Sequence, residues 1–142
     1  MNKFAKGIYQ IKNREKYIGR HTPCFRSSWE HSFMRFLDGT TAILQWASEP
    51  FAIPYYDPLN HRHRRYFPDF FIVYVDRNGE KHAELIEIKP MAQTGARKTR
   101  SKRNQLAAII NNAKWQAALQ WGAKNGCAFR LITEEQMFRG IR

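Results

Sequence analysis

The chain has 142 residues, of which 43% are hydrophobic and 14% aromatic, so it can bury a real core and is not an intrinsically disordered protein. Lys and Arg number 24 against 12 Asp and Glu, which gives a formal net charge of +12 and favours a polyanionic partner, most simply nucleic acid. No apolar run is long enough to span a bilayer, and residues 1–10 lack the apolar centre of a signal peptide. We therefore expect a single domain over residues 1–142, without a membrane partner.

The first 20 residues are basic and have weak hydrophobic periodicity. We expect a basic N-terminal arm over residues 1–20 that lies on the domain or on DNA, with a short ordered piece near Ile8 to Ile11. A solvated tail is the alternative. The two cysteines, Cys24 and Cys127, form no Cys-x-x-Cys pair, and free thiols in a reducing cytosol are the plain interpretation.

The stretch from Ser27 to Gly39 predicts the first helix. Ser27 followed by Glu30 three residues later is typical of a capping box, and glycine at 39 favours the helix end there. Glu30 has two explanations at this point. It caps the helix, or it supplies a third carboxylate to a metal site on the sheet below the helix.

Residues 43–47 and 51–55 are short apolar segments that predict a strand, a kink and an extended piece. Residues 55–60 are typical of a turn region. The run His61-Arg-His-Arg-Arg65 follows as a basic cluster directly before the next strand, where its position suits contacts with phosphate. From this cluster we predict that Arg62, Arg64 and Arg65 bind DNA.

Residues 65–90 predict a β-hairpin, with one strand from Pro68-Asp69 to Val75 and the other from about Lys81 to Lys89. A two-residue Asn-Gly loop would send Asp69 and Glu87 to opposite faces of the hairpin. A three-residue loop with Gly79 in the left-handed position pairs residue 76 with residue 80 and places Asp69 opposite Glu87. Aspartate at the first turn position and glycine at the fourth favour this second register.

Two carboxylates and an ammonium on one face can hold a divalent cation and the water beside it. Lys89 is two residues after Glu87 and shares its face. Carboxylate oxygens suit Mg²⁺, which lowers the pKa of its water and stabilises charge on a phosphoryl oxygen. A lysine there can orient or deprotonate the water, or balance developing charge. Glu-x-Lys alone is common on solvent-facing strands, but Pro-Asp on the partner strand makes the pattern more specific.

Residues 91–103 predict a basic loop with no acid in it. We expect phosphate contacts from its cations, since a run of like charges repels itself until an anion neutralises it. These predicted DNA-binding residues are Arg97, Lys98, Arg100, Lys102 and Arg103.

A long helix follows from about Lys102 to Lys124, with a predicted buried stripe at positions 106, 110, 113, 117 and 121. Asn112 and Lys114 flank that stripe and could reach the active face as supporting residues, although solvent exposure is the commoner fate of such positions. Residues 127–132 predict a closing strand parallel to the one that carries Glu87, and Thr133 opens a last short helix through another capping box. The element order predicts an α/β fold with a mixed central sheet flanked by helices.

Several motifs occur in an order that resembles a known family. They are Arg26-Ser-Ser-Trp-Glu30, Trp46-Ala-Ser-Glu-Pro-Phe-Ala-Ile-Pro-Tyr55, Arg65-Tyr-Phe-Pro-Asp-Phe70, Leu85-Ile-Glu-Ile-Lys-Pro90 and Ala113-Lys-Trp115. Pro68-Asp69 with Glu87-Ile88-Lys89 looks like the PD-(D/E)xK nuclease motif. Together the motifs resemble the head completion nucleases of T-even-like tailed phages, a family similar to the N-terminal endonuclease domain of TnsA transposition proteins.

The resemblance implies a restriction-endonuclease-like fold, DNA cleavage that depends on Mg²⁺ (with Mn²⁺ as a substitute) and a role in finishing the packaged phage head. It implies that Glu30, Asp69, Glu87 and Lys89 are catalytic, and that the carboxylates and the carbonyl of Ile88 bind metal. It also implies DNA as partner, with phage capsid, portal or head-completion proteins as further candidates. The implied location is the host cytoplasm or the virion.

Two alternatives stay open from sequence. The first is a head-completion protein that holds DNA ends without cutting them, against which the presence of all four site residues argues. The second is a TnsA-like subunit that cuts only with a partner recombinase.

Overall fold

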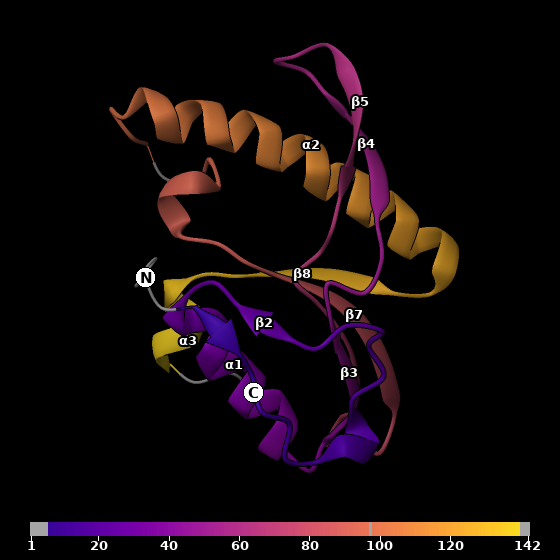
Figure 1. Cartoon of the computed structure of the whole chain (residues 1–142). Coiled ribbons are helices and arrows are strands. Elements are labelled where there is room, and N and C mark those ends of the chain that lie inside the picture. The colour runs from indigo at the N-terminus through magenta and orange to yellow at the C-terminus, as the bar shows by residue number, and fades with distance from the viewer. Residues whose placement is uncertain (1–5, 97, 140–142) are drawn as a thin grey trace.

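The computed structural model describes residues 6–96 and 98–139 (Figure 1). Its centre is a four-stranded mixed sheet in the order β3-β6-β7-β8. The strands are β3 (Ile43–Ser48), β6 (Phe70–Val75), β7 (Lys81–Ile88) and β8 (Ala128–Ile132). β6 pairs antiparallel with both β3 and β7, whereas β8 runs parallel to β7. The predicted mixed α/β sheet, and the parallel step into its last strand, are confirmed.

Helices cover both faces of this sheet (Figure 1). Alternate side chains of β6 point to opposite faces, so Phe70 and Ile72 pack in the cluster around α1 (Ser28–Gly39). Phe71 packs in the other cluster, beside α2 (Lys102–Asn125). The short α3 (Glu134–Arg139) follows β8, and Thr133 forms the predicted capping contacts with Gln136.

The helix α1 begins as predicted. Ser27 is its N-cap, and the Ser27 hydroxyl accepts a hydrogen bond from the backbone N–H of Glu30 at 3.2 Å. The helix α2 ends at a left-handed Gly126 (φ 68°). Four of the five positions predicted for its buried stripe, 110, 113, 117 and 121, pack partly buried against the core, and the most buried residues of α2 are Asn111, Trp115, Ala118 and Gly122.

The described part of the N-terminal arm, residues 6–20, lies over the domain. It contains β1 (Gly7–Ile8), which pairs with β2 (Cys24–Phe25), and the 3-10 turn η1 (Arg14–Lys16). A solvated tail is therefore the wrong interpretation for these residues. Residues 1–5 lie outside the described part of the chain.

A buried aspartate anchors this arm. Asp38, 1% exposed, accepts hydrogen bonds from the Tyr9 hydroxyl (2.7 Å) and from the backbone N–H groups of Lys12 (2.8 Å) and Asn13 (3.0 Å). Burial raises the pKa of Asp38, but these donors outweigh it and hold the pKa below its ordinary value. The Lys16 ammonium donates to three carbonyls at the C-terminal end of α1, where a positive charge is favourable.

The basic run before β6 is a strand, which the sequence prediction missed. β4 (Ile53–Asp57) and β5 (Arg62–Tyr66) form an antiparallel hairpin that crosses α2 and extends past it (Figure 1). Buried Asp57 closes the turn by accepting from the backbone N–H groups of Leu59 and Asn60. A short 3-10 turn, η2 (Met91–Gln93), follows β7 and begins the segment that leads to α2.

Replacing Asp38 with alanine leaves three donors without their acceptor in a buried place. We expect Asp38→Ala to lower the free energy of unfolding by about 3 kcal/mol at neutral pH, measured by urea denaturation. Because the folded-state pKa is depressed, the difference between wild type and variant should shrink as the pH falls through the acidic range. Glu15→Ala, at an exposed position of the same arm, is the control, and an equal loss there would contradict the account.

Candidate active site

The β6–β7 turn sets the geometry of the site. The N–H of Asp76 donates to the carbonyl of Glu80 at 2.9 Å, and Gly79 adopts a positive φ of 78°. This is the predicted three-residue loop, with glycine where a side chain would be strained. The register that follows pairs Val75 with Lys81 and Phe70 with Ile86, so the next pair along the hairpin is Asp69 and Glu87.

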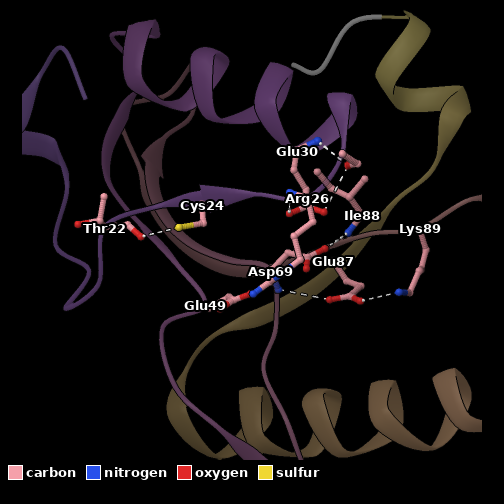
Figure 2. A network of polar contacts seen from close by, with 10 residues as sticks. Thr22, Cys24, Arg26, Glu30, Glu49, Asp69, Glu87, Ile88 and Lys89 are labelled. Carbon is pink, nitrogen blue, oxygen red and sulfur yellow. Dashed lines mark hydrogen bonds and ion pairs between the residues drawn. The ribbon is translucent and has the colours of Figure 1, made fainter. Parts of the chain in front are cut away.

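At the end of the hairpin, the backbone of Asp69 contacts the side-chain carboxylate of Glu87 (Figure 2). The N–H of Asp69 donates to Glu87 Oε1 at 3.3 Å, and Asp69 Oδ2 accepts from the N–H of Ile88 at 2.8 Å. Burial raises the pKa of Asp69 well above its ordinary value, and the negative charges of Glu87 and Glu30 raise it further. The hydrogen bond from the N–H of Ile88 and the charge of Lys89 oppose this rise in the pKa of Asp69.

Glu87 is 4% exposed and is held by two side chains in addition to Asp69. The Tyr66 hydroxyl donates to Glu87 Oε1 at 2.8 Å, and the Lys89 ammonium lies 3.7 Å from Glu87 Oε2. Burial raises the pKa of Glu87, while the charge of Lys89 and the Tyr66 hydrogen bond oppose the rise. These contacts fix the direction in which the carboxylate points.

Glu30 lies on the first turn of α1, where it makes capping contacts and also lies near Asp69. Its carboxylate accepts from the backbone N–H of Arg26 (3.3 Å) and from the Ser27 hydroxyl (3.3 Å), which are capping contacts. It also lies close enough to Asp69 for its charge to raise the pKa of that residue. Burial raises the pKa of Glu30 as well. Figure 2 shows the Glu30 side chain extending from α1 towards Asp69 and Ile88.

The donor set of this site fits a hard divalent cation. Three carboxylates with raised pKa values gather there, and a cation among them would relieve the repulsion that raises the pKa of Asp69. All-oxygen ligands suit Mg²⁺ or Mn²⁺. A second group of ligand-type atoms, from Asp76, Glu80 and His82, lies within 4.8 Å at the hairpin turn, at the other end of β6. It is largely exposed, and exposed acids commonly gather without an ion.

Comparison with known proteins identifies the family. The model of the TnsA-like endonuclease N-terminal domain matches residues 40–134 of this chain. Over 140 residues the chain is 34% identical to the head completion nuclease of Enterobacteria phage T4, with 91% of each chain covered.

The chain belongs to the TnsA-like endonuclease family. The resemblance drawn from the motifs is thereby confirmed, and with it a nuclease activity and the restriction-endonuclease-like fold class. Asp69, Glu87 and Lys89 fall inside the matched residues 40–134, whereas Glu30 precedes them.

The cations predicted to bind DNA in this endonuclease fall into two groups. Arg62, Arg64 and Arg65 lie on β5, and the rest lie between η2 and the first turn of α2. The members of the second group within the described residues are Lys98, Arg100, Lys102 and Arg103. All the described members are exposed, and Arg97 lies outside the described residues. Lys102 and Arg103 belong to α2 itself, so the predicted loop ends two residues earlier.

Asn112 and Lys114 have different surroundings on α2. The Asn112 amide donates to the carbonyls of Ala108 (2.7 Å) and Thr94 (3.5 Å), so it braces the segment after η2 and not the carboxylates. The Lys114 ammonium lies over the rings of Tyr55 and Tyr66. The Tyr66 hydroxyl donates to Glu87, so Lys114 lies beside a side chain that contacts the site.

Two residues with site contacts were missed by the sequence prediction. Tyr66 could have been found from its place three residues before Asp69, since a buried tyrosine hydroxyl needs a partner. Arg26 makes an ion pair with Glu49, a residue with a positive φ of 45° whose N–H donates to the carbonyl of Asp69. No sequence signal connects Arg26 with Glu49, because the pair depends on the path of the chain after β3.

The crowded carboxylates predict a gain in stability from a substitution that removes one charge. We expect Asp69→Asn to raise the melting temperature by about 3 °C at pH 7.5 in the absence of divalent cations, equivalent to about 1 kcal/mol. The folded-state pKa of Asp69 is raised, so the ionised group costs stability at neutral pH and this cost disappears as the pH falls towards the unfolded-state pKa. The gain should therefore vanish near pH 4.

Asp76→Asn is the matched control for this measurement. The hydrogen bond with His82, and those from the N–H groups of Glu80 and Asn78, lower the pKa of Asp76. Removing its charge should therefore lower the melting temperature. A drop in melting temperature for Asp69→Asn as well would show that the ionised Asp69 carboxylate does not destabilise the folded protein.

Proposed function

We propose that this member of the family is a Mg²⁺-dependent DNA endonuclease that hydrolyses phosphodiester bonds through Glu30, Asp69, Glu87 and Lys89. The observation that carries the proposal is the register of the β6–β7 hairpin. It brings Asp69 and Glu87 together, with the Lys89 ammonium 3.7 Å from the Glu87 carboxylate. Membership of an endonuclease family supports phosphodiester hydrolysis as the reaction of this arrangement.

Asp69 and Glu87, with Glu30 and the carbonyl of Ile88, would hold Mg²⁺ or, in its place, Mn²⁺. When bound, the cation supplies Lewis-acid stabilisation of the negative charge that develops on the phosphoryl oxygens. Tyr66 and the N–H of Asp69 keep the Glu87 carboxylate in place before any cation arrives. The site is thus pre-organised by hydrogen bonds that do not depend on the metal.

Lys89 orients the attacking water and balances the charge on the phosphate. Its side chain is 28% exposed, so it contacts Glu87 on one side and remains open to solvent and substrate on the other. Water adds to phosphorus, one P–O ester bond breaks, and a proton from the water is finally taken up by the leaving oxygen. The products are a phosphate monoester and a hydroxyl end.

The exposed cations of β5 and of the segment before α2 hold the DNA backbone in this proposal. Such contacts carry little sequence information, so cleavage should be weakly sequence-specific and strongly salt-dependent. The relative from Enterobacteria phage T4 is named a head completion nuclease, and we propose the same process for this chain. That process places the protein in the host cytoplasm or the virion, with capsid, portal or other head-completion proteins as partners.

None of the helices in the described parts of the chain combines the length and the apolar composition needed to cross a bilayer.

The decisive experiment compares cleavage of linear, branched and supercoiled DNA by the wild type, Asp69→Ala and Lys89→Ala, with Mg²⁺, with Mn²⁺ and with EDTA. We expect metal-dependent cleavage in the wild type and a fall in rate of at least about a thousandfold in both variants, because Asp69→Ala removes a ligand of the cation and Lys89→Ala removes the ammonium that orients the water and balances charge. Lys124→Ala, at an exposed position on α2, should cleave like the wild type.

The pattern of failure identifies the alternative. Cleavage that persists in EDTA, or in both variants, would contradict the proposed site. Tight DNA binding by all the proteins without any cleavage would favour a protein that holds DNA ends, or a nuclease that acts only with a partner subunit.

A further inference from the structure

A second lysine faces the site from the helix α2. Lys114 is half-buried, and its ammonium lies 5.9 Å from the centre of the Tyr55 ring and 5.7 Å from the centre of the Tyr66 ring. Both tyrosines belong to the β4–β5 hairpin, so Lys114 occupies the junction between that hairpin, α2 and the end of β7. Aromatic faces attract a cation and hold it in place when it is partly desolvated.

The Lys114 ammonium lies over two aromatic rings but has no carboxylate as an ion-pair partner within the described residues. In the parts of the chain that the structure describes, no carboxylate oxygen lies within 4.0 Å of its ammonium, whereas Lys89 has Glu87 at 3.7 Å. One of the two rings under Lys114 is that of Tyr66, whose hydroxyl is already bound to Glu87. The ring therefore connects the placement of Lys114 to the placement of the Glu87 carboxylate.

The charges around Lys114 are mixed. Burial lowers its pKa, the positive charges of Lys89 and Arg64 lower it further, and the charges of Glu87 and Asp69 oppose them. Lys114 thus lies between two cations that each have a carboxylate partner, Lys89 with Glu87 (3.7 Å) and Arg64 with Asp57 (3.3 Å). A half-buried lysine that has no carboxylate partner is stabilised by an anion beside it, and a phosphodiester backbone offers one charge per nucleotide.

We propose that Lys114 binds a phosphate of the DNA strand next to the phosphate that is cleaved, so that Lys89, Lys114 and Arg64 form a continuous path for the backbone from the active site to the β4–β5 hairpin. This inference rests on the proposed function, because it assumes that DNA is the substrate held at the site. Tyr55 and Tyr66 act as positioning residues for the Lys114 ammonium.

The test measures binding without cleavage, in the Asp69→Ala background with EDTA present. The dissociation constant of a fluorescein-labelled duplex is measured by anisotropy between 50 and 200 mM NaCl for that parent and for variants at position 114. Each phosphate contact contributes about 0.9 to the slope of log Kd against log salt. We expect Lys114→Gln to weaken binding and to lower this slope by about 1, and Lys114→Arg to retain the slope.

Two further variants keep the test informative. Lys114→Met retains the aliphatic stem over the tyrosine rings without the charge, and carries the same expectation if Lys114→Gln fails to fold. Lys124→Gln removes a charge from the exposed last turn of the same helix and should leave the slope unchanged. Unfolding of each variant is monitored by circular dichroism.

The outcomes separate this inference from the proposed function. An unchanged slope in folded Lys114→Gln or Lys114→Met, or an equal loss in Lys124→Gln, would overturn the role of Lys114 while leaving the nuclease intact. A lower slope for the variants at position 114, together with a wild-type protein that cleaves no DNA with Mg²⁺ or Mn²⁺, would support the phosphate contact and contradict the proposed catalysis.

Discussion

The pairing register of β6 with β7 is the constraint on which the site depends. The turn at Asp76–Glu80 fixes it, because a glycine with positive φ completes a three-residue loop. With a register one residue different, the side chains of Asp69 and Glu87 would face opposite sides of the sheet. The turn lies at the far end of the hairpin from the carboxylates, so a local backbone preference determines the geometry of a distant site.

The apolar core around this hairpin offsets the free-energy cost of burying the carboxylates of the site. Phe70, Ile72 and Ile86 pack under α1, and Leu85 packs beside α2, so both strands are buried on both faces next to the carboxylates. That apolar environment raises the pKa values of Asp69 and Glu87, and donors such as Tyr66 offset only part of the effect. A bound divalent cation would relieve the repulsion between these buried carboxylates, which links the stability of the fold to the chemistry we propose.

The parts of the fold that the sequence predicted are those with strong local signals. The Ser27 cap, the glycine turn and the closing parallel strand each depend on a few neighbouring residues. The β5 strand was missed because every residue of His61-Arg-His-Arg-Arg65 is polar and exposed, so no alternation of apolar residues marks it. The predicted stripe of α2 packs against the core at positions 110, 113, 117 and 121, whereas its first position, Leu106, is exposed like Ile109 and Leu119. Asp38 gave no hint of its burial, since its partners come from an arm more than 20 residues away.

The central claim is that the carboxylates of Glu30, Asp69 and Glu87 together form the cation site. The most direct measurement is the anomalous scattering of Mn²⁺ in crystals of the wild-type protein grown with that ion. We expect a peak between these carboxylates, close to the carbonyl of Ile88. Occupancy only at the exposed group of Asp76, Glu80 and His82, with the three carboxylates left empty at saturating Mn²⁺, would contradict it.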